Sequence, residues 1–194
     1  MSKSFKITII IVAIIISIMI YSNIQHKLTL SSMNIDKIDK AMYDIIVNDY
    51  NVNPPRALQL IKVVDSISLK CNIDPLIVYA MIAKESSFRN ILIRWDVTDY
   101  SVGYMQIHKS TYNYVRNIFA KRWWSSYKNL VFNWQDGIIA GVYYLYIIQH
   151  YWKRAHNDIW YAVSIYNGNK EKYSMYMISV KNIYDRFKNQ VKEQ

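Results

Sequence analysis

The sequence predicts an all-α fold. Its 194 residues include only four glycines and three prolines, whereas average usage of the two together would be roughly 12%. All-β folds need turn residues about every 8–12 positions, and phosphate-binding loops need clustered glycines, so this composition excludes both. With 52% hydrophobic residues, the chain is rich enough to bury a core and is unlike a disordered tail.

The N-terminal segment has the pattern of a membrane-spanning or signal helix. Lys3 and Lys6 precede an apolar run over residues 7–24, close to the roughly 17–25 residues that span a membrane. A cleaved signal peptide has the same order but needs a small-x-small site, and residues 29–31 offer only a weak one. We therefore expect residues 1–26 to be a retained anchor, with secretion after cleavage as the alternative. The two lysines would keep the N-terminus cytoplasmic and place the rest outside the membrane.

The charge balance indicates an anionic partner. The formal net charge is +10, which suits nucleic acid, an acidic membrane face or an anionic wall polymer. Because the chain is expected to be exported, we exclude nucleic acid and favour the wall or the membrane. Cys71 is the single cysteine, and the four histidines lack metal-ligand spacing, so we expect no disulfide, metal or cofactor.

Several amphipathic stretches predict helices joined by short connections. Residues 27–70 are interpreted as a linker with accessory helices, and residues 71–194 as the main domain. Asp74 is an N-cap candidate followed by proline at the first helical position, Asn133 is another N-cap candidate, and Gly168 is a helix terminator. The predicted helices cover residues 33–51, 54–70, 75–86, 109–119, a long segment from 134, and 158–166.

Glu85 is the first candidate for chemistry. It follows the apolar stretch 76–83, interrupted only by Lys84. A carboxyl group beside apolar packing has its charged form disfavoured, so its pKa rises and it can hold a proton near neutrality. That property suits a general acid, although a glutamate at a helix end is more often a solvated surface residue.

Four segments in order resemble the motifs of the lytic transglycosylases, lysozyme-like enzymes that cleave peptidoglycan glycan strands. Residues 72–88 resemble the catalytic helix, with its Asp-Pro start and its Glu-Ser followed by an aromatic residue. Residues 103–107 (Gly-Tyr-Met-Gln-Ile) match the Gly-Leu-Met-Gln-Ile segment with tyrosine for leucine. Residues 136–145 resemble the scaffold helix, and residues 165–169 the Tyr-Asn-Ala-Gly motif. All four glycines fall inside these segments, so we expect them to serve close backbone approach or positive φ.

The resemblance implies a lysozyme-like helical domain in which Glu85 is the catalytic acid and base. Its expected substrate is the β-1,4 bond between N-acetylmuramic acid and N-acetylglucosamine, and its product a 1,6-anhydromuramoyl end. The resemblance also implies a group of site or substrate-binding residues: Ser86, Met105, Gln106, Tyr166 and Asn167. Tyr166 is expected to point at the catalytic carboxyl, Met105 could instead be core, and Asn167 could instead fix the local turn.

The chain departs from the family pattern between Ser87 and Gly103, where the usual Gly-Ala pair is replaced. Asp96 and Asp99 lie in this stretch. Goose-type lysozymes, which are similar in fold, use aspartates from this region to position a water and hydrolyse the same bond. A muramidase therefore remains an alternative, and a non-catalytic glycan-binding or assembly protein is a second one. The resemblance leaves the setting open among growth and a secretion, conjugation or phage lysis apparatus.

Overall fold

A computed structural model describes most of the chain, and most of it is helical, as predicted. The backbone forms two compact units, Met1–Lys40 and Ala41–Gln194, and every feature below belongs to the second. The described residues are 37–94, 100–119, 126–130 and 132–193.

The N-terminal anchor predicted over residues 1–26 lies outside the described residues. Within the described part of the chain, no helix is both long and apolar enough to cross a membrane. Residues 41–48 are helical, inside the first predicted helix. The predicted boundary of the main domain at residue 71 stays a prediction.

Two helices that carry the first part of the site begin at prolines, as predicted. α2 (Pro54–Cys71) and α3 (Pro75–Ser86) both have proline in the first helical turn. The Asp74 side chain caps α3 by accepting a hydrogen bond of 2.9 Å from the backbone N–H of Leu76. Ser87 ends the helix in the left-handed conformation (φ 50°). Local sequence signals therefore set both ends of the segment that carries Glu85.

A small sheet accompanies the helices, and the fold remains mostly helical, consistent with the all-α prediction. β1 (Leu92–Arg94), β2 (Tyr100–Val102) and β3 (Ile107–His108) form three antiparallel strands in that order. The β2–β3 connection turns through two positive-φ residues, Gly103 (83°) and Gln106 (45°). Strands of two or three residues are too short to show the apolar–polar alternation that identifies a strand from sequence.

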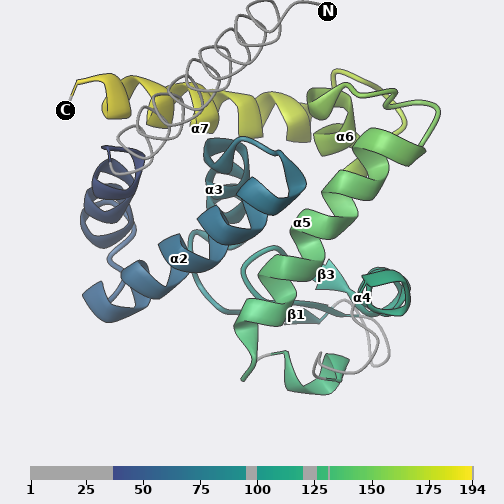
Figure 1. Cartoon of the computed structure of the whole chain (residues 1–194), viewed down its shortest axis with the longest axis horizontal. Helices are drawn as coiled ribbons and strands as arrows, with labels where there is room; N and C mark the ends of the chain where they lie inside the picture. Colours follow the sequence, from purple (N-terminus) through teal and green to yellow (C-terminus); the bar gives the residue numbers. More distant parts are fainter. Residues whose placement is uncertain (1–36, 95–99, 120–125, 131, 194) are drawn as a thin grey trace, which may run out of the picture. The chain divides into compact units, whose positions relative to one another are not determined.

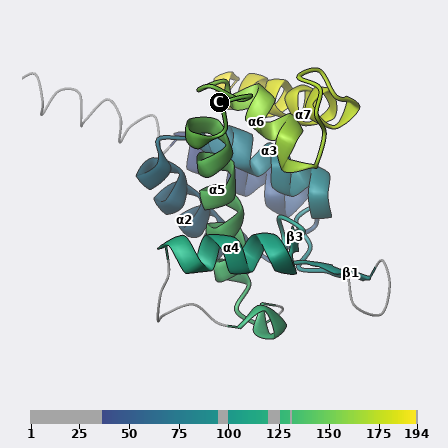
Figure 2. The same ribbon diagram turned by 90° about the vertical axis from the view of Figure 1, so that its right-hand side faces the viewer.

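The remaining helices include three whose bounds are close to those predicted, over residues 109–119, 134–151 and 159–166, and two that were not predicted. They are α4 (Lys109–Phe119), η1 (Tyr127–Asn129), α5 (Trp134–Tyr151), α6 (Ile159–Tyr166) and α7 (Met175–Lys192). α5 packs against α2, α4 and α6 and runs between an end formed by α6 and α7 and an end formed by α4 and the sheet (Figure 1; Figure 2). Asn133 is the N-cap of α5, but its side chain makes no capping hydrogen bond.

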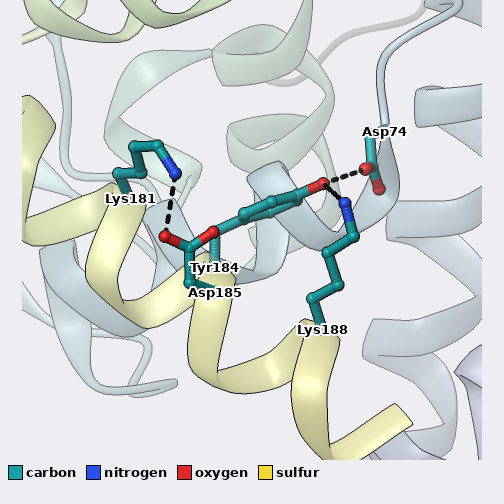
Figure 3. Close-up of polar contacts among 5 residues, drawn as sticks. All are labelled: Asp74, Lys181, Tyr184, Asp185 and Lys188. Atoms are coloured by element: carbon teal, nitrogen blue, oxygen red, sulfur yellow. Dashed lines mark hydrogen bonds and ion pairs between the residues drawn. The ribbon is translucent and has the colours of Figure 1, made fainter. Parts of the chain in front are cut away.

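α7 was not predicted, and it packs along α3. The Tyr184 hydroxyl of α7 donates a hydrogen bond of 3.0 Å to Asp74, the same carboxylate that caps α3 (Figure 3). Lys188 donates to the Tyr184 hydroxyl at 3.3 Å. One aspartate thus fixes the start of α3 and also joins it to α7.

Candidate active site

Glu85 lies in a cleft of about 740 Å³ between the two ends of the domain. It is the next-to-last residue of α3 and is partly buried. The cleft lining comes from β2, β3 and the start of α4 on one side, and from α6 and α7 on the other. Segments far apart in the sequence therefore meet around one carboxyl group.

Burial raises the pKa of Glu85 to about 7. The hydrogen bond from Tyr176 and the charges of Lys84 and His108 lower this pKa, but together they offset only part of the desolvation. The direction of this shift, upward through burial, is the one expected from the sequence. At neutral pH a substantial fraction of Glu85 is protonated, as a general acid requires.

Tyr176 is the site residue that the sequence reasoning missed. Its hydroxyl donates a hydrogen bond of 2.5 Å to Glu85 Oε1. Burial, followed by the nearby Glu85, raises the pKa of Tyr176 well above its usual range, so the phenol keeps its proton. Glu85 near the end of α3 contacts Tyr176 near the start of α7, and Asp74 at the start of α3 contacts Tyr184 further along α7, so the two helices run antiparallel.

Tyr166 makes a different contact from Tyr176. Its hydroxyl donates a hydrogen bond of 2.9 Å to the backbone carbonyl of Met105. Burial and then the charge of Glu85 raise the pKa of Tyr166 well above normal, so the ring lies near the carboxyl although the hydroxyl is engaged elsewhere. Tyr166 therefore joins the end of α6 to the loop between β2 and β3.

Ser86 faces inward, away from the cleft. The residue is 3% exposed, and its hydroxyl lies 2.9 Å from the carbonyl of Tyr104 and 3.1 Å from that of Ile82. The contact to Tyr104 connects α3 to the β2–β3 loop. Ser86 thus holds the element next to Glu85 in place and has little surface for a substrate.

The two central residues of the Met-Gln segment differ in where they lie. Met105 is 1% exposed, and its side chain packs against Gly141 of α5. The Gln106 amide lines the cleft, and its Nε2 donates to the carbonyls of Gly103 (2.7 Å) and Ile91 (3.1 Å). Its buried Oε1 has no hydrogen-bond partner among the described residues. This oxygen is therefore enclosed in the wall of the cleft, and Gln106 as a whole is 9% exposed.

Three of the four glycines have the positive φ or the close approach to a neighbouring group that we expected from the scarcity of glycine in the chain. Gly103 and Gly168 have φ of 83° and 79°. A Cβ at Gly141 would lie 2.5 Å from Met105 Sδ, so this position needs a close approach, whereas Gly137 has nothing within 4 Å. Gly137 is thus the exception.

Asn167 lines the cleft at the end of α6 and is exposed. Its Oδ1 accepts a hydrogen bond of 3.2 Å from Asn169. Beyond it, Ser164 of α6 contacts the carbonyl of Glu171 and lies 2.7 Å from the Ser174 hydroxyl, which caps α7. These hydrogen bonds hold the connection between α6 and α7, which includes Asn167, and they also position the start of α7.

Asp96 and Asp99 lie outside the described residues. Among the residues that the structure describes, no group of three or more His, Cys, Asp or Glu side chains could hold a metal ion.

The site falls within a known family pattern. A family model described as "Transglycosylase SLT domain" matches residues 62–182, which is more than half of the chain and includes both Glu85 and Tyr176. No curated protein matches the chain.

Proposed function

The chain belongs to the SLT transglycosylase family, a family of peptidoglycan lytic transglycosylases, and from this premise we propose that it cleaves the β-1,4 bond between N-acetylmuramic acid and N-acetylglucosamine. Glu85 acts as the single catalytic acid and base, and the product carries a 1,6-anhydromuramoyl end. The observation that carries the proposal is a carboxyl group with a pKa of about 7 inside a cleft, hydrogen-bonded by a buried tyrosine.

In the first half of the reaction, protonated Glu85 donates its proton to the glycosidic oxygen. The bond between C1 of the muramoyl sugar and this oxygen breaks, and the N-acetylglucosamine leaves with a free 4-hydroxyl group. Glu85 becomes a carboxylate, and the Tyr176 hydroxyl stabilises that charge because it donates to Oε1. The tyrosine thus favours the form of Glu85 that this step creates.

In the second half, the C6 hydroxyl of the same muramoyl sugar attacks C1. Glu85 takes the proton of this hydroxyl and returns to its initial protonated state, so protons balance over the cycle. Because the nucleophile belongs to the substrate, one carboxylate suffices where ordinary glycosidases need two. We assign substrate binding to Gln106, which lines the cleft beside Glu85.

Two alternatives to the anhydro-forming reaction remain, hydrolysis of the same bond and glycan binding without cleavage. If Asp96 or Asp99 positions a water, the same bond is hydrolysed and a reducing end appears instead of an anhydro sugar. If the cleft binds glycan without cleaving it, neither product forms. The proposal favours the anhydro product because the family is one of transglycosylases.

Mass spectrometry of the products released from purified sacculi tests the proposal. We expect anhydromuropeptides from the parent enzyme and none from Glu85→Gln, with Glu193→Gln, an exposed glutamate at the end of α7, as the matched control. Reducing-end products would support the muramidase instead. Undiminished release by Glu85→Gln would reject the catalytic role of this residue.

We also propose that residues 1–26 anchor the protein in the membrane, with the domain on the extracytoplasmic side. The support is the order of charges in the sequence, in which Lys3 and Lys6 precede the apolar run. Alkaline extraction of membranes and protease treatment of intact cells test this placement. Release of the protein by carbonate would instead favour cleavage and secretion.

A further inference from the structure

Three helices contribute side chains to one surface around Tyr143 of α5. The Tyr143 ring stacks on the ring of Phe119, at the end of α4, with the centroids 4.3 Å apart and an angle of 8° between the ring planes. Lys70, near the end of α2, places its Nζ 5.7 Å from the centroid of the Tyr143 ring. Figure 2 shows the end of α4 on the same side of α5 as α2. The surface therefore joins α2, α4 and α5.

The same surface continues to the end of α5. Tyr146 lies three residues after Tyr143 and so neighbours it on the helix. The Tyr146 ring centroid lies 4.5 Å from that of His150 and 6.2 Å from that of Tyr151. Tyr151 is 71% exposed, and Leu69 of α2 is 74% exposed. We call this surface the aromatic face and define it by six residues: Leu69, Lys70, Phe119, Tyr143, Tyr146 and Tyr151.

The charge around the aromatic face is positive. Residues 100–157 include seven lysines and arginines and a single acidic residue, Asp136. Asp136 lies in the first turn of α5, at the opposite end from Tyr151. Lys153 and Arg154 are exposed in the turn that follows α5. This end of the domain therefore attracts an anionic surface.

The mixture of apolar and basic side chains distinguishes a lipid surface from a soluble polyanion. A soluble polyanion is held by cations and gains nothing from exposed apolar side chains such as Leu69 and Tyr151. A membrane uses both, because tyrosine and tryptophan are enriched at the level of the headgroups and lysine and arginine attract anionic lipids. Joined exposed apolar residues with a polar rim are typical of such interaction sites. The aromatic face therefore fits a membrane better than a polymer in solution.

We infer that the aromatic face docks the folded domain on the headgroup region of a membrane that contains anionic phospholipids. In one respect the inference rests on the proposed anchor. The ten residues 27–36 lie between that anchor and the first described residue, and they span at most roughly 35 Å. An anchored domain therefore always stays close to the bilayer, where even a weak contact is made.

Docking by this face leaves the cleft uncovered. Tyr144 lines the cleft, and it follows Tyr143 by one residue, which is a rotation of about 100° around the helix. The cleft and the aromatic face therefore lie on different sides of α5. The inference is independent of the reaction proposed for Glu85.

A fluorophore placed beside the aromatic face tests the docking. Cys71 is 3% exposed, so a new surface cysteine can be labelled selectively in the folded protein. Ser66→Cys carries the label at an exposed position of α2, one turn before Leu69, and Asn182→Cys carries it at an exposed position of α7 as the control. The full chain is reconstituted with phosphatidylcholine vesicles, with or without phosphatidylglycerol. A phospholipid that carries a nitroxide on its headgroup is the quencher.

We expect the lipid to quench the label at position 66 and not the label at position 182. The quenching should require phosphatidylglycerol, and it should fall as salt is added because the exposed charges are screened. Equal quenching at the two positions would overturn the inference.

Removing the basic residues gives a second measurement. The triple variant Lys70→Gln, Lys153→Gln and Arg154→Gln should lower the ratio of docked to undocked protein about a hundredfold, since each cation near an anionic membrane changes this ratio about fivefold. A matched triple variant has the same net charge and should keep the quenching. It replaces exposed lysines outside the aromatic face by glutamine: Lys109, Lys170 and Lys192. Equal quenching in both triple variants would overturn the inference.

Two further outcomes separate docking from its alternatives. If inorganic polyphosphate protects the label at position 66 from aqueous iodide and the lipid does not quench it, the face binds an anionic polymer and the inference is wrong. Carbonate extraction reports on the anchor alone. A chain that carbonate extracts but lipid quenches at position 66 would reject the anchor and keep the docking. A carbonate-resistant chain with equal quenching at both positions would reject the docking and keep the anchor.

Discussion

Replacing Tyr176 by phenylalanine removes one hydroxyl group from the site and keeps the ring that fills the space. This hydroxyl donates to Glu85 Oε1, and its effect is to lower the pKa of Glu85 against the larger effect of burial. Without it, the carboxylate loses a stabilising partner and the protonated form is favoured. The pKa of Glu85 should therefore rise above its value of about 7.

The size of the change follows from the energy of the hydrogen bond. A hydrogen bond to a charged group contributes about 1.5–3 kcal/mol, and one between neutral groups about 1 kcal/mol. The difference favours the carboxylate by about 0.5–2 kcal/mol, and one pKa unit corresponds to about 1.4 kcal/mol. We expect the Tyr176→Phe variant to hold Glu85 at a pKa about one unit higher than the parent.

The assay is the initial rate of muropeptide release from sacculi as a function of pH. Glu85 must be protonated to act as an acid, so activity is present at low pH and is lost as the pH rises through its pKa. The alkaline limb of Tyr176→Phe should lie about one pH unit above that of the parent. The rate on the plateau should fall roughly tenfold, because the carboxylate formed after proton transfer is less stable. Tyr173→Phe, at a tyrosine that is 72% exposed, is the control.

An alkaline limb that stays in place, or moves to lower pH, would refute this reasoning. Either result would mean that Tyr176 does not stabilise the charged form of Glu85. A lower rate without a shift would assign the tyrosine to packing alone.

Three further predictions concern stability, each measured by denaturant or thermal unfolding. Gly141→Ala should lower the free energy of unfolding by about 1–3 kcal/mol, because the new Cβ would lie 2.5 Å from Met105 Sδ. Gly137→Ala, which has open space around it, should instead raise the free energy of unfolding by about 0.5–1 kcal/mol. Equal effects of the two substitutions would contradict the close approach at Gly141. Glu85→Gln should stabilise the protein above pH 7 by up to about 3 kcal/mol and leave its stability unchanged below pH 4.5. The reason is that the carboxyl of the folded parent keeps its proton over a pH range in which the carboxyl of the unfolded chain ionises. A stability difference between variant and parent that does not depend on pH would argue against the raised pKa. Asp74→Ala should cost about 1–2 kcal/mol through loss of the α3 cap and of the link to α7, and a cost near zero would show that backbone geometry alone starts the helix.

The start of α3 could be predicted because it depends on local signals, whereas Glu85 became a strong candidate only through the resemblance of four segments to a known family. Asp74 and Pro75 define a helix start within two residues, and the apolar run that follows makes the last turn a place of high desolvation. Gly103 and Gly168 were predictable for a similar reason, since glycine in a chain that avoids it indicates special backbone geometry.

Tyr176 could not be found in this way. It is one of 18 tyrosines, and its role depends on α7 packing along α3, which no nearby residue indicates. The small sheet escaped detection because its strands are two or three residues long. Met105 shows the same limit, since only the approach of Gly141 reveals that its side chain is packed inside. Contacts between distant segments decide these positions, and periodicity does not report them.

The pairing of Glu85 with Tyr176 joins positions 91 residues apart, and this separation has a consequence for how the protein is made. A ribosome adds about 5–20 residues per second, so Glu85 is synthesised roughly 5–20 seconds before its partner. During that interval the carboxyl lacks the wall that buries it and the hydroxyl that adjusts its acidity. Acid strength therefore arises only with the complete fold, and a nascent or prematurely terminated chain carries the glutamate without its chemistry.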